Sequence, residues 1–568
     1  MAGMNMHKAP AIILLGPGSL ATAQRIKGLY PGAAIHGLSG RVEGTDHSYA
    51  SFGDTLRGLY QQDTPIIALC AAGIVIRSLA SMLTEKGVEP PVLAVAEDGS
   101  TVVPLLGGLA GVNVMAREIG EALGVPAAIT TSGELRFGTC LLNPPEGYAL
   151  ADIEQGKRFV SDLLAGETVR VEGDAPWLAQ VQLPASESAQ RIIHVGCEAR
   201  PASRDELLIH ARSVVVAIES VGPALVEQVR AALGAAGIAE PSLACLLVAE
   251  QAMAEPSLHE AAQTLGVALR FAPRVSGLAD LASAALPGAR LIEQGGVVIA
   301  LAPSPVDVTQ VGRPRGRLAV IGLGPGAAEL MVPAVKAELA RAQDVLGYET
   351  YVRMAGPFRG DQILHCTDNR EEMQRARHAF ELAAQGRSVV VVSSGDPGVF
   401  AMAAAVLEAL HESTDPAWHR VDLEILPGVS ASLATAAQAG APLGHDFCVM
   451  SLSDNLKPWS IIERRLDLAA QADLVLAFYN PISRSRPWQL GRALEIVRQH
   501  REGNTPVVLG RDVGRPGQTL KVVPLAELVP EMVDMRTMVL IGSSTTCTFE
   551  RADGGLWTYT PRWYGSKP

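Results

Sequence analysis

The chain has 568 residues, and its 47 Lys and Arg against 59 Asp and Glu give a formal net charge of -12. This length corresponds to about three to four domains, and the acidic balance argues against nucleic acid as the main partner. The seven cysteines include no CxxC pair, so no zinc, iron–sulfur or disulfide framework is indicated, and a cytosolic chain with reduced thiols is expected. No run of about eighteen apolar residues predicts a membrane span.

The first 134 residues alternate strand-like and helical patterns, which predicts a parallel α/β domain over residues 1–140. The expected strands are 12–15, 66–69, 92–95 and 127–130, and the expected helices are 20–29, 74–84 and 114–123.

The middle of the chain divides into three stretches. Residues 141–190 are rich in turn residues and are expected to be a connecting region. Residues 191–303 return to an α/β pattern and predict a small domain, with strands at 192–195, 214–218, 243–247 and 267–271. Residues 304–315 are the expected linker, because Pro and Gly interrupt them.

A buried-strand run at 318–321 turns at Gly322-Leu323-Gly324-Pro325-Gly326, and a second strand at 388–393 ends in Gly395-Asp396-Pro397-Gly398. In a parallel sheet, the crevice beyond such strand ends binds a small ligand. Pro325 lacks an N–H, which suits an uncharged part of a ligand better than a pyrophosphate. Asp396 can accept from an ammonium or a hydroxyl, or it can cap the helix that begins near Val399.

Four motifs follow one another in a fixed order: the two glycine loops above, then Pro427-Gly428-Val429-Ser430-Ala431 and Phe478-Tyr479-Asn480-Pro481. In these motifs the sequence resembles the tetrapyrrole methylases, which use S-adenosylmethionine. Residues 451–459 and 483–486 look like the precorrin-3B C17-methyltransferase branch of cobalamin biosynthesis. The resemblance implies a two-lobed methylase fold over residues 316–568, with lobes at about 316–443 and 444–568, and a homodimer. The fold class expected for the whole chain is multidomain α/β.

The resemblance also implies a donor site. Its lining would be Gly324, Pro325, Gly395, Asp396, Val399, Ser430, Ala431, Asn480 and Gly510. Ser430 reads equally well as a helix N-cap, and both roles are compatible. A sulfonium methyl is already electrophilic, so the protein chiefly aligns donor and acceptor and keeps water out. Neither a metal nor a covalent nucleophile is expected.

The substrate of this branch carries many carboxylates, which cationic side chains in loops would bind. Lys457, Arg484 and Arg486 follow strand-like runs and lead a set that also includes Arg353, Arg359, Arg511 and Arg515. The family reaction contracts the macrocycle from a hydroxylated meso carbon, so a group should accept that hydroxyl proton. His445, Asp446 and Asp454 are the candidates, and the sequence does not rank them.

The first half resembles the cobalt-precorrin-5A hydrolases in residues 73–77, Lys86, Pro91-Val92, residues 104–108, Asn113 and residues 129–131. Residues 250–255 and 265–267 resemble the small domain that ends that family. Leu109 stands where the family has a His, and Leu cannot take a proton. His36 and His47 are the substitutes in principle. Three hypotheses follow: a methyltransferase with a degenerate, hydrolase-like binding module, a bifunctional enzyme, or a scaffold that channels tetrapyrroles. Leu109 modestly favours a metal-free precorrin-3B over a cobalt-bound substrate.

Overall fold

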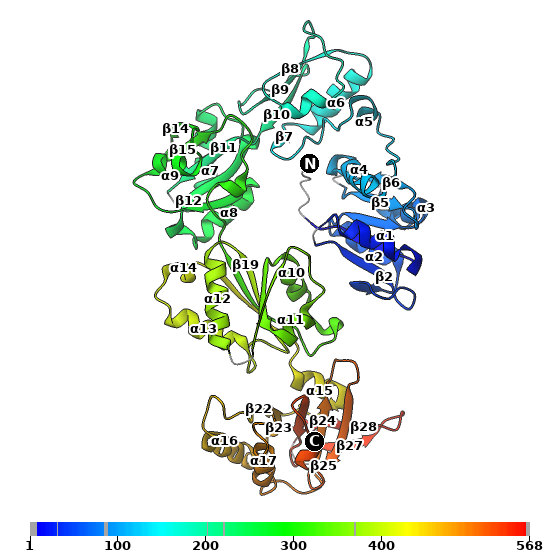
Figure 1. The fold of residues 1–568 in the computed structure, drawn as a ribbon, viewed down its shortest axis with the longest axis vertical. Coiled ribbons are helices and arrows are strands. Elements are labelled where there is room, and N and C mark those ends of the chain that lie inside the picture. Colours follow the sequence, from blue (N-terminus) through cyan, green and yellow to red (C-terminus); the bar gives the residue numbers. More distant parts are fainter. Residues whose placement is uncertain are drawn as a thin grey trace. The chain divides into compact units, whose positions relative to one another are not determined.

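The computed structural model describes residues 8–30, 32–83, 89–201, 203–219, 222–368 and 371–563 (Figure 1). The chain forms two compact units. The first spans Met1–Arg315 and Arg359–Asp361, and the second spans Gly316–Phe358 and Gln362–Pro568. The division falls where the expected linker ends. No helix within the described ranges combines the length and apolarity that a membrane crossing needs.

The N-terminal sheet has the strand order β3-β2-β1-β4-β5-β6. Its strands are β1 (Ala11–Leu14), β2 (Ala34–Leu38), β3 (His47–Tyr49), β4 (Ile66–Leu69), β5 (Val92–Val95) and β6 (Val102–Leu106). The helices around it include α1 (Leu20–Lys27), α2 (Phe52–Gln61), α3 (Ala72–Leu79) and α4 (Val112–Leu123). The expected strand at 127–130 is wrong, because only an isolated bridge from Val102 to Ala127 forms there.

Residues 141–190 form part of a second sheet, with the order β7-β10-β9-β8, so they are more than a connection. Its elements are β7 (Tyr148–Leu150), α6 (Ile153–Leu164), β8 (Val169–Glu172), β9 (Arg191–Gly196) and β10 (Glu206–Ala211). Gly173 ends β8 with φ +96°, and a Cβ there would lie 1.9 Å from the Val195 carbonyl oxygen. The turn residues that suggested a connection therefore lie at the ends of short, paired strands.

The third sheet has the order β13-β12-β11-β15-β14. It comprises β11 (Val214–Ile218), β12 (Leu243–Ala249), β13 (Ala268–Ala272), β14 (Arg290–Gln294) and β15 (Val297–Leu301), covered by α7 (Leu225–Ala235), α8 (Pro256–Leu265) and α9 (Leu278–Ala285). The expected linker packs against this sheet. Phe271 and Arg313 exchange two backbone hydrogen bonds of 2.8 Å, and Arg270 Nε donates to the Val311 carbonyl at 2.7 Å.

The first lobe of the second unit is a parallel sheet with the order β18-β17-β19-β16-β20. Its strands are β16 (Arg317–Gly322), β17 (Asp344–Tyr348), β18 (Ile363–Thr367), β19 (Ser388–Ser393) and β20 (Asp422–Leu426). Both faces are buried, as a parallel sheet requires. Leu318 and Val320 pack with α12 (Glu372–Ala384) and α13 (Met402–Glu412), while Ile321 packs with α10 (Pro333–Arg341) and α11 (Glu349–Ala355) on the other face (Figure 1).

The second lobe is a mixed sheet with the order β22-β23-β26-β24-β25. The strands are β22 (Phe447–Ser451), β23 (Val475–Tyr479), β24 (Pro506–Arg511), β25 (Thr519–Pro524) and β26 (Thr537–Ile541). The helices are α15 (Ala431–Ala439), α16 (Trp459–Gln471) and α17 (Gln489–Val497), and a hairpin of β27 (Cys547–Glu550) and β28 (Leu556–Tyr559) pairs with β21 (Gly440–Ala441). Because β26 is antiparallel to both β23 and β24, the strands β22, β23 and β24 all end at one edge.

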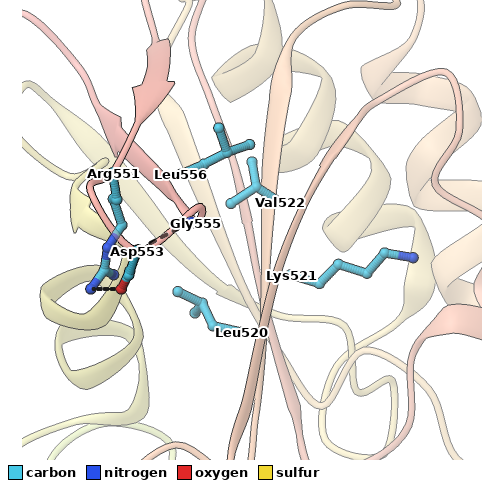
Figure 2. A pocket seen from close by; sticks show the side chains of 7 residues that line it. All are labelled: Leu520, Lys521, Val522, Arg551, Asp553, Gly555 and Leu556. Carbon is cyan, nitrogen blue, oxygen red and sulfur yellow. Dashed lines mark hydrogen bonds and ion pairs between the residues drawn. The ribbon is translucent and has the colours of Figure 1, made fainter.

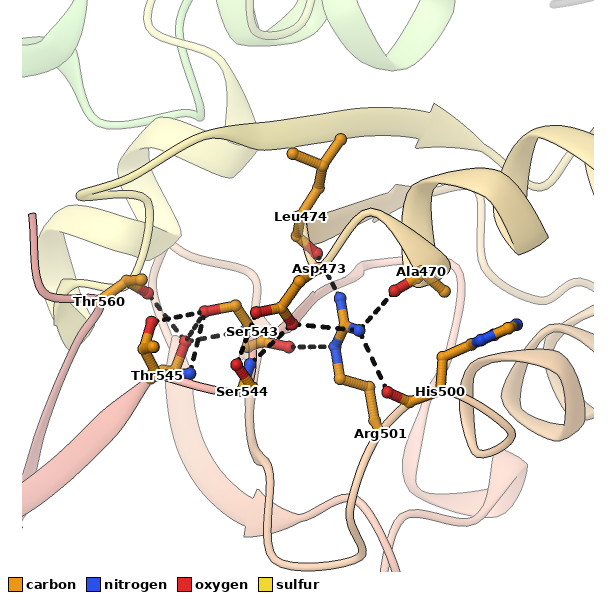
Figure 3. Close-up of polar contacts among 11 residues, drawn as sticks. Ala470, Asp473, Leu474, His500, Arg501, Ser543, Ser544, Thr545 and Thr560 are labelled. Carbon is orange, nitrogen blue, oxygen red and sulfur yellow. Dashed lines mark hydrogen bonds and ion pairs between the residues drawn. The ribbon is translucent and has the colours of Figure 1, made fainter. Parts of the chain in front are cut away.

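The opposite edge of this sheet is closed by a buried arginine (Figure 3). Arg501 donates from Nη1 and Nη2 to the carbonyls of Ala470 and Leu474, at 2.5 and 2.9 Å, and its ion pair with Asp473 measures 3.2 Å. Asp473 also accepts from the Ser544 amide and hydroxyl, at 2.9 and 2.6 Å. These contacts join the end of α16 to the loop after β26.

Candidate functional site

Three glycine-containing loops meet beyond the carboxyl ends of β16, β19 and β20. Gly324 and Gly395 exchange two backbone hydrogen bonds of 3.1 and 2.8 Å, and both have positive φ, +74° and +70°. A Cβ on Gly428 would lie 2.1 Å from the Gly395 carbonyl oxygen. Only glycine permits this approach, so the loops predicted from separate motifs form one packed surface.

Asp396 ties two of these loops together. Its Oδ1 accepts from the Gly398 amide at 2.8 Å, and its Oδ2 accepts from the Gly428 amide at 3.0 Å. A carboxylate offers about four acceptor sites, so roughly two remain for a ligand ammonium or hydroxyl. The turn-capping role and the ligand-binding role that the sequence left open are therefore compatible.

Pro325 is buried and is held by the second lobe. Arg515, in the loop between β24 and β25, donates from Nε to the Pro325 carbonyl at 2.8 Å and from Nη2 to Ser394 Oγ at 3.2 Å. A Cβ on Gly514 would lie 2.8 Å from Pro325 Cγ. Arg515 belonged to the predicted carboxylate binders, but its contacts give it a role in holding the glycine loop.

Several amide donors in the first turn of α15 form hydrogen bonds within the protein. Ser430 is the N-cap, and its Oγ accepts from the Leu433 amide at 3.4 Å. The Ser432 amide donates to the Tyr479 hydroxyl at 3.1 Å, and that hydroxyl donates to Ser432 Oγ. The helix N-terminus is therefore a poor phosphate site, which agrees with a ligand that is uncharged beside Ser430 and Ala431.

Asn480 has a left-handed backbone, with φ +50°, directly after β23. Its side-chain Nδ2 donates to Ser451 Oγ at 3.0 Å, and its carbonyl accepts from Arg486 Nη1 at 2.9 Å. Arg486 is buried, with 6% of its surface exposed, and also contacts Met535 Sδ at 3.6 Å. These contacts give Arg486 a positioning role for Asn480, in place of the direct carboxylate binding that the sequence predicted.

Gly510 lies in β24 beneath α15. A Cβ at this position would lie 2.5 Å from Cγ2 of Thr435, which is fully buried. This packing against a helix explains a glycine here without any ligand.

The predicted substrate cations differ in their surroundings. Lys457 Nζ lies 5.8 Å from the ring centroid of Phe400. The rings of Phe400 and Tyr479 form a T-shaped pair, with centroids 5.4 Å apart. Burial, followed by the positive charge of Arg465, lowers the pKa of Lys457. Arg484 is exposed in the loop after β23. The loop that carries Lys457 follows β22, and the loop that carries Arg484 follows β23. Because Ser451 and Tyr479 are paired at the ends of these strands, both loops begin at the edge of the sheet at which Asn480 lies.

The three candidate bases lie at opposite edges of the sheet. His445 and Asp446 precede β22, whereas Asp454 follows it, and a five-residue strand separates its ends by about 13 Å. Asp454 Oδ2 accepts from Gln489 Nε2 at 3.1 Å and shares the edge of Asn480 and Lys457. Asp454 is thus the only one of the three on the side of the glycine loops.

Leu109, in the N-terminal domain, is 44% exposed and lies in a short 3-10 turn, Gly108–Ala110. His36 and His47 are paired across β2 and β3, with ring centroids 4.8 Å apart. Four strand spacings separate β2 from β6, which precedes Leu109, or about 19 Å. Neither histidine therefore replaces the expected base beside Leu109.

The residues around the three glycine loops fit S-adenosylmethionine. Asp396 offers acceptor capacity for an ammonium beside the packed glycine loops, and the Ser432 amide at the start of α15 is already bonded to the Tyr479 hydroxyl. In the described parts of the chain, no group of three or more His, Cys, Asp or Glu side chains could hold a metal ion.

A separate cavity of about 420 Å³ lies between β25 and the β27–β28 hairpin (Figure 2). Leu520 and Val522 line one side and Leu556 the other, and Arg551 pairs with Asp553 at 3.1 Å at its rim. None of the predicted site residues lines this cavity.

Comparison with known proteins divides the chain in the same way. Residues 317–529 match the family described as Tetrapyrrole (Corrin/Porphyrin) Methylases, and residues 54–134 match the family described as Cobalamin synthesis G N-terminal. Tetrapyrrole methylases use S-adenosylmethionine.

A protein named Precorrin-3B C(17)-methyltransferase from Sinorhizobium sp is 52% identical over 250 residues, which are 44% of this chain and 97% of that protein. Cobalamin biosynthesis protein CobIJ from Mycobacterium bovis (strain ATCC BAA-935 / AF2122/97) is 47% identical over 253 residues, and the chain covers only 48% of it. The crystal structure of the methyltransferase CobJ is 52% identical, with a TM-score of 0.41, covering 43% of this chain and all of that one.

Proposed function

Because this chain belongs to the tetrapyrrole methylases, we propose that residues 316–568 transfer a methyl group from S-adenosylmethionine to C17 of precorrin-3B in cobalamin biosynthesis. The observation that carries the proposal is the 52% identity over nearly all of a relative named for that reaction. The packed loops at Gly324, Gly395 and Gly428 support it, because they form one surface at the end of the parallel sheet.

The donor, when bound, supplies an electrophilic methyl group. Asp396 would hold the amino-acid end through its remaining acceptor sites, and Pro325 would face the uncharged part of the molecule. Asn480 would meet it from the second lobe, fixed by Arg486 and Ser451. Alignment and exclusion of water are then the contributions of the protein.

Ring contraction to precorrin-4 stays a prediction. The proton of the hydroxyl on the meso carbon would pass to Asp454, because that carboxylate lies at the same edge of the sheet as Asn480 and Lys457. His445 and Asp446 precede the same strand and lie about 13 Å away along it.

The N-terminal unit is, in this proposal, a degenerate hydrolase-like binding module. The family match over residues 54–134 supports a relation to cobalamin biosynthesis, and the exposed Leu109 supplies no base. The bifunctional enzyme is the second candidate, and the same family match favours it.

A homodimer and a cytoplasmic location also stay predictions. The hairpin β27–β28 supports the dimer, because its aromatic residues Phe549, Trp557 and Tyr559 are 53%, 37% and 38% exposed. A second copy of the chain would cover them. Light scattering of the full chain should give twice the monomer mass, and Phe549→Asp should lower it; a monomeric wild type contradicts the dimer.

Incubation of the full chain with precorrin-3B and methyl-labelled donor tests the main proposal. One label per tetrapyrrole, with the mass of precorrin-4, is expected. If only the cobalt-bound compound is labelled, the substrate is cobalt-factor III and not precorrin-3B. If neither compound is labelled, the channelling scaffold is the hypothesis that remains. Cobalt-precorrin-5A offered to the same chain should release no acetaldehyde; its release would establish the bifunctional enzyme.

A further inference from the structure

Phe400 has a backbone conformation that aromatic residues rarely adopt, with φ +54° in the left-handed region. Among the described residues, the other non-glycine positions with positive φ are Asp63, Asp473, Asn480 and Asp512. Aspartate and asparagine tolerate this region because their short polar side chains bond to the nearby backbone, whereas a bulky residue there is an outlier. The loop between β19 and α13 therefore carries backbone strain at Phe400.

Burial of the ring does not account for this strain, because Phe400 is 51% exposed. Backbone hydrogen bonds on both sides hold the loop in this form. The Val399 amide donates to the Asp396 carbonyl at 3.2 Å, and the Ala403 amide donates to the Pro397 carbonyl at 2.9 Å. A small polar residue would meet the demands of this turn with less strain. Strained residues of this kind gather at ligand-binding positions.

Two side chains of the second lobe lie beside the Phe400 ring. Tyr479, the last residue of β23, forms a T-shaped pair with it, with centroids 5.4 Å apart. Lys457, in the loop after β22, places its Nζ 5.8 Å from the ring centroid. Asp396 lies four positions before Phe400, and Asn480 directly follows Tyr479. The ring therefore adjoins both segments that the proposed donor site uses.

An exposed aromatic ring with an ammonium beside it suits a ligand that is apolar in its body and anionic at its rim. The tetrapyrrole of the proposed function has this chemistry, with an apolar ring system and peripheral carboxylates. Its apolar atoms would gain free energy by covering the Phe400 ring. The Lys457 ammonium can form a charge-assisted hydrogen bond to a carboxylate. A small anion would use the ammonium but would leave the ring exposed.

We propose that Phe400 is a substrate-binding residue, whose ring supports the tetrapyrrole macrocycle while Lys457 binds one of its carboxylates. This inference rests on the proposed methyltransferase function and adds Phe400 to its site. The left-handed backbone is the means by which the loop after β19 presents an aromatic ring to the second lobe. Because the ring is held in place by the loop, the substrate does not have to order it on binding.

The test measures the Kd of precorrin-3B by spectral titration of the full chain in the presence of S-adenosylhomocysteine. Phe400→Asn should raise this Kd about fivefold to tenfold, since a half-exposed Phe gains about half of the free energy of full burial. Phe400→Tyr keeps the ring and should keep the wild-type Kd. Leu407→Gln is the matched control, because Leu407 is 46% exposed on α13, and it should also keep that Kd. The Kd of S-adenosylhomocysteine should be the same in all four proteins.

Thermal unfolding separates binding from packing. Asparagine tolerates the left-handed region, so Phe400→Asn should unfold at the same temperature as the wild type or a higher one. A lower temperature would assign the ring to packing between the lobes and overturn this inference. An unchanged Kd for precorrin-3B in Phe400→Asn, or a rise that S-adenosylhomocysteine shares, would do the same. If the wild type binds precorrin-3B through Phe400 but gives no labelled product, only the proposed function is overturned.

Discussion

Arg515 Nε donates to the carbonyl oxygen of Pro325 at 2.8 Å, across 190 positions of sequence. The bond joins a loop of the second lobe to the first glycine loop. Since Arg515 also donates to Ser394, it touches the segments that follow both β16 and β19. The donor site proposed here therefore depends on contact between the lobes.

Arg515→Ala should weaken donor binding, because the Pro325 carbonyl and the loop around it lose their charged partner. Hydrogen bonds to charged groups contribute about 1.5–3 kcal/mol, so the Kd for S-adenosylhomocysteine should rise about tenfold or more in calorimetry. Lys521→Gln is the matched control, since Lys521 is exposed on β25. Equal Kd values for Arg515→Ala and the wild type would remove Arg515 from the site.

Arg486→Met should destabilise the second lobe and impair donor binding together. The substitution leaves the part-buried Asn480 carbonyl without its donor, which costs up to about 1–3 kcal/mol. Thermal unfolding and the KM for the donor measure the two effects, and Arg486→Lys should restore both in part. A raised KM for the tetrapyrrole alone would return Arg486 to direct substrate binding.

Gly510→Ala should destabilise the fold by about 1–3 kcal/mol, the usual range for overpacking, because its Cβ would lie 2.5 Å from Thr435 Cγ2. Thr435→Ala removes that methyl group, so the double variant should be more stable than Gly510→Ala alone. Urea unfolding of the four proteins forms the cycle. If the double variant shows the summed loss of the two single variants, the packing explanation is wrong.

His36 makes the stability of the N-terminal sheet depend on pH. Burial, followed by the charge of His47 and opposed by Asp46, lowers the pKa of His36 from 6.5 to about 4. The unfolded chain therefore takes up a proton before the folded one does. The free energy of unfolding should be highest above pH 6.5 and should fall as the pH decreases toward about 4.

Hydrogen-exchange protection factors for the amides of β2 measure this dependence. The decrease between pH 7 and 5 should be smaller in His36→Phe, which has no ring proton to take up. An identical decrease in both proteins would assign the effect to another group.

Much of the second unit could be predicted from local patterns. The strand predicted at 388–393 has the bounds of β19, and the one predicted at 318–321 lies within β16, because a buried strand is a short apolar run that needs no distant partner to be recognised. Short or exposed strands such as β8 and β27 carry no such signal, and they were missed. The prediction of a strand at 127–130 was wrong for the opposite reason: the apolar run is present, but it pairs with the sheet only through the isolated bridge from Val102 to Ala127.

The sequence by itself determined the order of the glycine loops and which residues could face a donor, because loop glycines and an acidic turn residue act locally. Only the tertiary structure decided what each cation does. Arg486 and Arg515 bind backbone carbonyls, whereas Lys457 lies over the ring of Phe400. The reason is physical: the partner of a long side chain depends on which segments fold against it. These segments are distant in the sequence, so the residues next to the side chain do not predict its partner.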